Sequence, residues 1–134
     1  QKDNFDFSFS GFKTSVKNYL ESQSEEFIQE HLADITASVQ EAIVDSLVSK
    51  TIRYAKKSGA TKLIIAGGVS ANSLLRTRMT EEAKKIQAEL IYPRLEYCMD
   101  NAAMIGAAAI EKYYRKEFAD LTLNAFSKKG LRLI

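Results

Sequence analysis

The sequence predicts an α/β protein in which a short sheet is packed by helices. Short apolar runs typical of buried strands alternate with longer segments of helical periodicity, and a glycine pair joins one such strand directly to a helix. The expected order is strand, helix, long helix, strand, helix, strand, helix. Because no internal repeat or linker interrupts this order, we expect residues 1–134 to form a single domain.

Composition restricts the class of protein. Of the 134 residues, 46% are hydrophobic and 27% charged, with a formal net charge of +2; this is typical of a soluble globular domain. No apolar run approaches the roughly 18 residues of a membrane span, and the first residues do not resemble a signal peptide. We therefore expect a cytoplasmic protein with no membrane partner. The chain begins at Gln1, which suggests a processed or excised piece.

One cysteine and one histidine limit the chemistry of the chain. With Cys98 alone, no internal disulfide or cysteine-rich zinc site can form. With His31 alone, no site that needs two histidines can be completed within the chain. We expect His31 to be structural or on the surface. Cys98 is expected to be a small buried apolar residue and not a nucleophile.

The first expected elements are a strand and a helix. Residues 5–9 alternate apolar and polar side chains, which predicts a short edge strand with one buried face. Ser10 and Gly11 interrupt the alternation and predict a turn. Apolar residues at helical spacing then predict a helix over about 12–21.

Residues 24–58 carry the strongest helical periodicity, with an apolar residue at every third or fourth position. Asp34 belongs to a favoured N-cap type, so we expect a short helix before it and a long helix from about 35 to 58. Ser58 and Gly59 predict the end of the long helix. The apolar stripe consists of Phe27, Ile28, Leu32, Ile35, Val39, Ile43, Leu47 and Ile52.

Two strands and two helices complete the expected fold. Residues 62–66 form a short apolar run typical of a buried strand, and a glycine pair leads from it into a helix. Residues 89–92 predict a second strand that ends at a proline. A last helix is expected over 102–114, with an early face of small residues that would let it lie close to a sheet or another helix. These small residues are Ala103, Gly106, Ala107 and Ala109.

The glycine pair is the first candidate binding site. Gly67 and Gly68 let the backbone approach a flat or charged ligand at the amino end of the next helix. Asn72 would lie at the rim of that site, where its amide can donate and accept hydrogen bonds. The competing interpretation is a glycine turn in which Ser70 or Asn72 caps the helix, and spacing alone favours it.

Asp100 is the second candidate, because it precedes a helix that follows a strand and a loop. Its carboxylate could bind a metal or orient a ligand hydroxyl, although capping of the helix is preferred on spacing alone. Both candidates follow presumed parallel strands, whose carboxyl ends are where open α/β sheets bind ligands. We therefore expect the two candidates to share one cleft.

A third candidate is the turn formed by Ser8, Ser10, Gly11 and Lys13. Such a turn offers amide and hydroxyl donors to a phosphate, with a lysine near by. An ordinary turn is the preferred interpretation.

Four blocks of sequence, residues 5–14, 34–40, 66–76 and 98–105, resemble in order and spacing the catalytic subunits of the tRNA N6-adenosine threonylcarbamoyltransferase family, formerly called O-sialoglycoprotein endopeptidases. The resemblance covers nearly all of this chain but only the carboxyl-terminal portion of the family. It implies part of an actin and sugar-kinase-like fold, which contains a ribonuclease H-like sheet.

The resemblance also implies a reaction and roles for the candidates. The family transfers threonylcarbamoyl from its adenylate to N6 of a tRNA adenosine next to the anticodon, in a cleft between two lobes. Asn72 resembles the asparagine that contacts the bound nucleotide, ATP or the adenylate, with Gly67 and Gly68 beneath it. Asp100 resembles the aspartate that completes a site for iron or zinc. With the resemblance, both binding roles are preferred over capping.

Departures from the family pattern imply that the chain alone is inactive. The two metal-binding histidines and the phosphate loops of the first lobe are absent, and Met99 replaces a small hydroxyl residue. The expected partners are tRNA, the missing N-terminal lobe and accessory proteins of the threonylcarbamoyladenosine pathway. The alternative is a non-catalytic nucleotide-binding or assembly module that retains the fold. A zinc peptidase is excluded, since a single histidine cannot complete a His-Glu-x-x-His motif.

Overall fold

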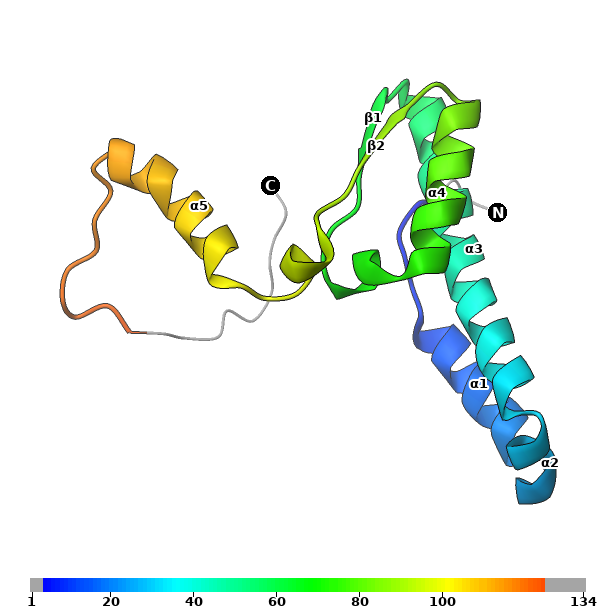
Figure 1. Ribbon diagram of the computed structural model, residues 1–134. Helices are drawn as coiled ribbons and strands as arrows, with labels where there is room; N and C mark the ends of the chain where they lie inside the picture. Colours follow the sequence, from blue (N-terminus) through cyan, green and yellow to red (C-terminus); the bar gives the residue numbers. More distant parts are fainter. Residues whose placement is uncertain (1–3, 125–134) are drawn as a thin grey trace. The chain divides into compact units, whose positions relative to one another are not determined.

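The computed structural model describes residues 4–124, and the chain divides into two units, Gln1–Met99 and Asp100–Ile134. The first unit combines helices with a small parallel sheet, which confirms the α/β class (Figure 1). The single domain expected for the whole chain stays a prediction.

The elements are α1 (Ser10–Glu21), α2 (Glu25–Glu30), α3 (Leu32–Ser58), β1 (Lys62–Ile64), the 3₁₀ helix η1 (Gly68–Ala71), α4 (Ser73–Lys85), β2 (Glu89–Ile91), the 3₁₀ helix η2 (Leu95–Tyr97) and α5 (Ala102–Tyr114). Among the described residues, no helix is both long and apolar enough to cross a membrane.

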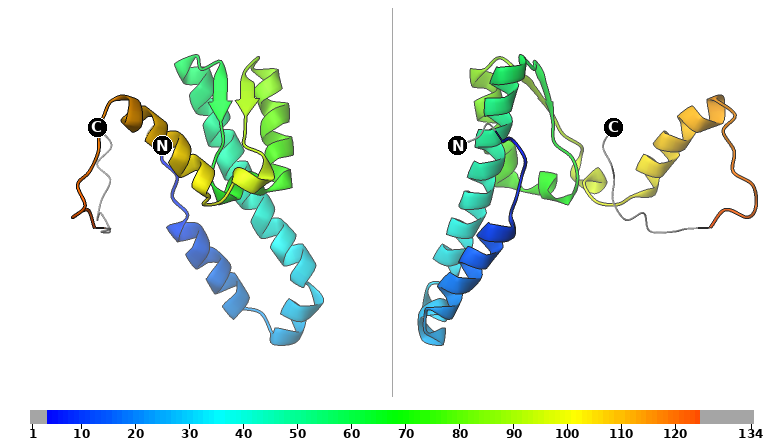
Figure 2. Two further views of the ribbon diagram at one scale, coloured as in Figure 1. Left: turned by 60° about the vertical axis from the view of Figure 1, so that its left-hand side comes forward. Right: turned by 180° about the vertical axis from the view of Figure 1, so that it is seen from behind.

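β1 and β2 pair in parallel, as the sequence predicts, with Leu63 opposite Leu90. α3 and α4 lie side by side against one face of this sheet (Figure 2). The buried core residues are Val44, Val48, Ile52, Ala55, Leu63, Leu75, Met79, Ala83 and Ala88. Removal of these side chains from water is the main favourable term in the stability of this unit.

Within the first unit, the described residues leave the opposite face of the sheet uncovered. Ile64 is 73% exposed and Ile91 40% exposed, whereas the apolar run predicted a buried strand. β1 also ends at Ile64 and not at residue 66, although the Ile65 amide still donates to the Ile91 carbonyl (3.0 Å). A strand is buried on both faces only when layers pack against both, and the helices of the first unit cover one face.

α3 has two apolar faces, and the predicted stripe contains one of them and only part of the other. Ile35, Val39 and Ile43 of the predicted stripe are half-buried and line grooves beside α1. The other face packs against α4 and the sheet, and consists of Val44, Val48, Ile52 and Ala55. The predicted stripe omits Val44 and Val48, because a helix between two partners carries apolar residues around more of its circumference than one stripe.

Residues 5–9 do not form a strand, which corrects the prediction for this segment. The Phe5 ring packs edge-on to Tyr54 of α3, with ring centroids 5.1 Å apart. The Arg53 guanidinium lies 5.0 Å from the centre of the same ring. An alternating segment becomes a strand only beside another strand, and in the described structure its neighbour is a helix.

The predicted helices are present, with two corrections to where they begin. α1 begins at Ser10, so the expected Ser-Gly turn is the first turn of a helix. Asp34 lies within the first turn of α3 and does not cap it, because the break between α2 and α3 falls at His31. As predicted, α3 ends at Ser58, and the C-cap Gly59 has the left-handed conformation at φ 71°.

α5 belongs to the second unit and has the bounds that the sequence predicts. Asn101 caps it, since Asn101 Oδ1 accepts from the Met104 amide (2.9 Å). The sequence indicates that the small early face, which includes Gly106, would let α5 lie close to a sheet or another helix, and this stays a prediction.

Candidate functional site

The loop after β1 forms the glycine turn that the sequence predicts. Gly67 has φ 81° and ψ 175°, a conformation that is essentially restricted to glycine. Ser70 of η1 is fully buried, and its hydroxyl donates to the Gly67 carbonyl (2.7 Å). A Cβ atom at Gly67 or Gly68 would meet no heavy atom within 4 Å. The surface of this turn therefore has room for a ligand.

Asn72 caps α4, which confirms one of its two predicted roles. Asn72 Oδ1 accepts from the Leu75 amide (2.9 Å), and Asn72 Nδ2 donates to Gln40 Oε1 of α3 (2.8 Å). A side-chain amide has two N–H donors and two acceptor lone pairs. Among the described residues, one of each stays unpaired on Asn72, so capping is compatible with ligand binding.

The sequence alone singles out neither Gln40 nor Arg76, although both lie beside this loop. Gln40 holds the Asn72 amide. Arg76 lies one turn further along α4 and donates to backbone carbonyls after both strands. Helical periodicity assigns polar residues to the solvent-facing side of a helix, so it does not single out Gln40 or Arg76. The signal that could have found them is that each falls within a block that carries the family resemblance.

Cys98 is buried, as predicted, with 2% of its surface exposed. Its Sγ accepts a hydrogen bond from Arg76 Nη2 (3.1 Å), and its thiol donates to the Arg94 carbonyl (3.5 Å). These contacts hold the sulfur inside the loop that follows β2.

Asp100 is exposed and does not cap α5, which corrects the capping interpretation, because Asn101 is the cap. Among residues 4–124, no three His, Cys, Asp or Glu side chains gather closely enough to hold a metal ion. The described residues therefore do not by themselves fit an iron or zinc site. Asp100 begins the second unit, whereas Asn72 lies in the first, and the shared cleft stays a prediction.

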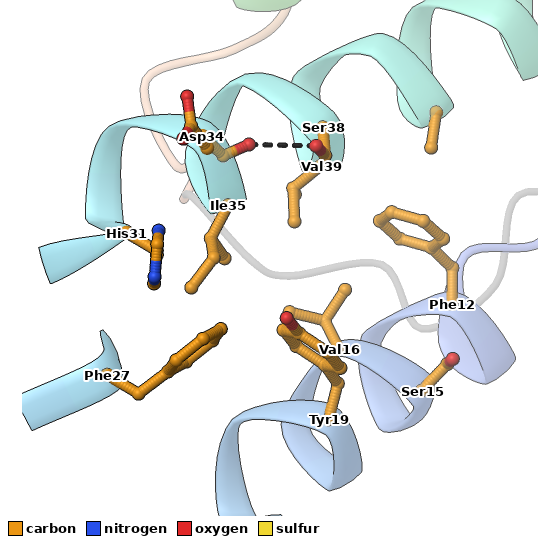
Figure 3. Close-up of a pocket in the computed structure, with 11 residues that line it drawn as sticks. Phe12, Ser15, Val16, Tyr19, Phe27, His31, Asp34, Ile35, Ser38 and Val39 are labelled. Carbon is orange, nitrogen blue, oxygen red and sulfur yellow. Dashed lines mark hydrogen bonds between the residues drawn. The ribbon is translucent and has the colours of Figure 1, made fainter. Parts of the chain in front are cut away.

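The groove drawn in Figure 3 lies between α1, α2 and α3 and has a volume of about 450 Å³. Apolar side chains such as Phe12 and Ile35 line it. At one end, the His31 and Phe27 ring centroids are 4.3 Å apart, which confirms a structural place for His31. Asn72 is not among the lining residues.

The third candidate falls on a second groove between α1, α3 and η1. Ser10 and Lys13 line this groove together with apolar residues that include Val39 and Val69. Because Ser10, Gly11 and Lys13 belong to α1, they do not form the predicted turn. Phosphate binding by this segment stays a prediction.

Comparison with known proteins identifies the family. A family described as tRNA N6-adenosine threonylcarbamoyltransferase matches residues 1–107. Proteins of that name from Kosmotoga olearia and Pelodictyon phaeoclathratiforme are 46% and 52% identical to the chain over 125 and 121 residues. A third, from Chlorobium luteolum, is 53% identical over 108 residues.

The matches cover 93%, 90% and 81% of this chain but 37%, 35% and 31% of the three relatives. The chain therefore spans about a third of the length of the relatives that it matches. Because the family match extends over most of the residues, the chain belongs to the tRNA N6-adenosine threonylcarbamoyltransferase family.

Proposed function

We propose that this chain supplies the nucleotide-binding loop of a tRNA N6-adenosine threonylcarbamoyltransferase. The complete enzyme would transfer threonylcarbamoyl from its adenylate to N6 of a tRNA adenosine next to the anticodon. In this proposal, Gly67 and Gly68 let the backbone approach the adenylate or ATP, and Asn72 orients the ligand by hydrogen bonds. Family membership and the room above the glycine turn support this role.

The observation that carries the proposal is that the Asn72 amide is held in place and can still form further hydrogen bonds. Its contacts with Leu75 and Gln40 fix the direction of both polar atoms, yet each atom can form a second bond. An amide held in place loses little conformational entropy when a ligand binds. In addition, the amino end of α4 favours a negatively charged group such as phosphate.

Asp100 is proposed as one ligand of iron or zinc in the complete enzyme. A transition metal held by N and O ligands usually has imidazole among them, and the single histidine of this chain lies in the first unit, in contact with Phe27. The histidine ligands would therefore come from outside these residues. The chain alone is expected to bind the metal weakly.

The isolated chain is proposed to be inactive as a transferase. It spans about a third of its relatives, and a nucleotide in half of a two-lobed cleft stays exposed to water. The proposed fold is a partial actin and sugar-kinase-like lobe that an N-terminal lobe completes. The proposed partners are tRNA and accessory proteins of the threonylcarbamoyladenosine pathway, in the cytoplasm.

Calorimetric titration of the chain with ATP, or with a stable analogue of threonylcarbamoyl adenylate, tests the proposal. We expect weak binding that needs neither Fe²⁺ nor Zn²⁺, is lost in Asn72→Ala and is retained in Asp100→Ala. Ser24→Ala is the matched control, because it removes the N-cap of α2, away from the glycine turn. Unchanged binding in Asn72→Ala would refute the nucleotide role. Tight binding that requires both metal and Asp100 would show that the chain completes its own site.

The incomplete metal ligand set also favours a second candidate, a nucleotide-binding or assembly module without catalysis. A transferase assay on a reconstituted mixture distinguishes the enzyme role from the non-catalytic module. Chain, adenylate and tRNA are combined with and without a separately produced amino-terminal lobe of a relative, and modified adenosine is measured by liquid chromatography. Product that appears only with the added lobe supports the enzyme role, and a stable complex without product supports the module.

A further inference from the structure

We propose that Arg76 is a positioning residue that couples the loop after β1 to the loop after β2. The first is the glycine loop (residues 67–72), which ends at Asn72, and the second is the proline loop (residues 93–98). This inference rests on the proposed function, because it assigns a supporting residue to the nucleotide site. According to this inference, the glycine loop keeps its conformation only while the hydrogen bonds of Arg76 connect it to the proline loop.

Arg76 contacts both loops with one side chain. Its Nε donates to the Ser70 carbonyl (2.5 Å) in the glycine loop. Its Nη2 donates to the Pro93 carbonyl (2.9 Å) and to Cys98 Sγ (3.1 Å), at the two ends of the proline loop. The guanidinium therefore joins the two loops directly.

The chemistry of arginine suits this role. A guanidinium is planar and presents its N–H donors in a fixed fork, so it can serve diverging acceptors at once. The Arg76 group lies over the Tyr92 ring, 4.5 Å from the ring centre, and the side chain is half-buried. If it moved away, Ser70, Pro93 and Cys98 would lose a donor that water replaces poorly at such a site.

The position of Arg76 in the fold explains why its contacts bear on Asn72. β1 and β2 are parallel neighbours, so the loops after them leave the sheet at the same edge. Within α4, the Arg76 amide donates to the Asn72 carbonyl (3.1 Å). A displacement of the proline loop is thus transmitted through Arg76 to the helical turn that carries Asn72.

Arg78 provides a matched control on the same helix. Its guanidinium pairs with Glu41 and Asp45 of α3, whose carboxylates are 55% and 67% exposed. Ion pairs with exposed partners contribute little to stability. Substitution of Arg78 therefore changes an arginine of α4 and leaves the coupling between the loops intact.

The experiment compares Arg76→Lys with Arg78→Lys in the 134-residue chain. Cys98 is the only cysteine, so its alkylation rate reports opening of the proline loop, while amide hydrogen exchange reports the glycine loop. Lysine keeps the charge but has no fork. We expect Arg76→Lys to speed both processes about tenfold, the effect of losing roughly one net hydrogen bond, and Arg78→Lys to leave both at the wild-type rate.

The two readouts decide the inference together. Wild-type rates in both loops of Arg76→Lys would refute the coupling. Faster alkylation of Cys98 with unchanged exchange in the glycine loop would refute it as well. If Arg76→Lys does not fold, Tyr92→Leu removes only the ring beneath the guanidinium. The same direction of change is then expected in both loops, and wild-type rates would overturn the proposal.

Nucleotide titration separates this inference from the proposed function. We expect Arg76→Lys to lower the thermal midpoint and also to weaken nucleotide binding, and Arg78→Lys to leave nucleotide binding unchanged. A purely structural residue at position 76 would lower the midpoint and leave nucleotide binding unchanged. If Asn72→Ala binds nucleotide like the wild type, the proposed function fails, and alkylation and exchange still decide the coupling. If Asn72→Ala abolishes binding but Arg76→Lys does not weaken it, the positioning role fails and the proposed function stands.

Discussion

Substitution of Asn72 separates its observed capping of α4 from its proposed contact with a nucleotide. Asn72→Ala removes the acceptor of the Leu75 amide and the donor to Gln40. Asn72→Asp keeps an oxygen acceptor at the cap and places a negative charge at the amino end of a helix, where it is favourable. The Gln40 amide can rotate and donate to that carboxylate. The aspartate variant should therefore keep the cap and repel a phosphate.

The structure gives the expected magnitudes. Loss of an asparagine cap costs about 1 kcal/mol, and loss of the bond to Gln40, which is exposed, costs about 0.5 to 1 kcal/mol more. We expect Asn72→Ala to lower the free energy of unfolding by about 1.5 to 2 kcal/mol. For Asn72→Asp we expect a change within about 0.5 kcal/mol.

Urea denaturation measures the free energy of unfolding, and calorimetry measures nucleotide binding for the same variants. Nucleotide binding should be lost in both, whereas stability should fall only in Asn72→Ala. If Asn72→Asp is as unstable as Asn72→Ala, the assignment of the cap to the side-chain oxygen is wrong. If Asn72→Asp is stable and binds nucleotide like the wild type, Asn72 does not contact the phosphate-bearing ligand.

Three further predictions concern the core, the glycine turn and a titrating group. Met79 is 1% exposed, so Met79→Ala should lower the free energy of unfolding by about 2 to 5 kcal/mol; a smaller loss in urea denaturation would mean that the cavity collapses. Gly67→Ala should cost about 1 to 3 kcal/mol because of its positive φ, whereas Gly68→Ala, which has no such φ, should change stability little. The pKa of Glu26 is lowered by its own backbone amide and by the Ser24 hydroxyl. The contribution of Glu26 to stability is therefore present above the ordinary pKa of glutamate and is lost as the pH falls through the lowered pKa. Ser24→Ala should raise the pKa of Glu26, which an NMR titration measures. An unchanged pKa would contradict the contact with the Ser24 hydroxyl.

Local patterns in the sequence predicted most of the elements. The parallel strand pair, the glycine turn and the end of α3 at Ser58 are where composition and spacing place them. The cap at Asn72 was one of two interpretations of the same residue, and the structure shows that it is compatible with the other. Two predictions that assumed neighbours distant in the sequence were wrong. Residues 5–9 have no neighbouring strand in the described structure, and within the first unit one face of β1 has no covering layer.

The sequence by itself determined what depends on neighbours along the chain: helical and strand periods, the glycine turn after β1, and the side chains able to cap a helix. Only the tertiary structure decided which polar groups meet across the fold. Gln40 reaches Asn72 from α3, and the Arg76 guanidinium joins two loops whose carbonyls are 6 and 17 residues away in the sequence. The physical reason is that a hydrogen bond requires the directions and separation of two particular groups. Packing of α3, α4 and the sheet sets those directions, and no local pattern encodes them.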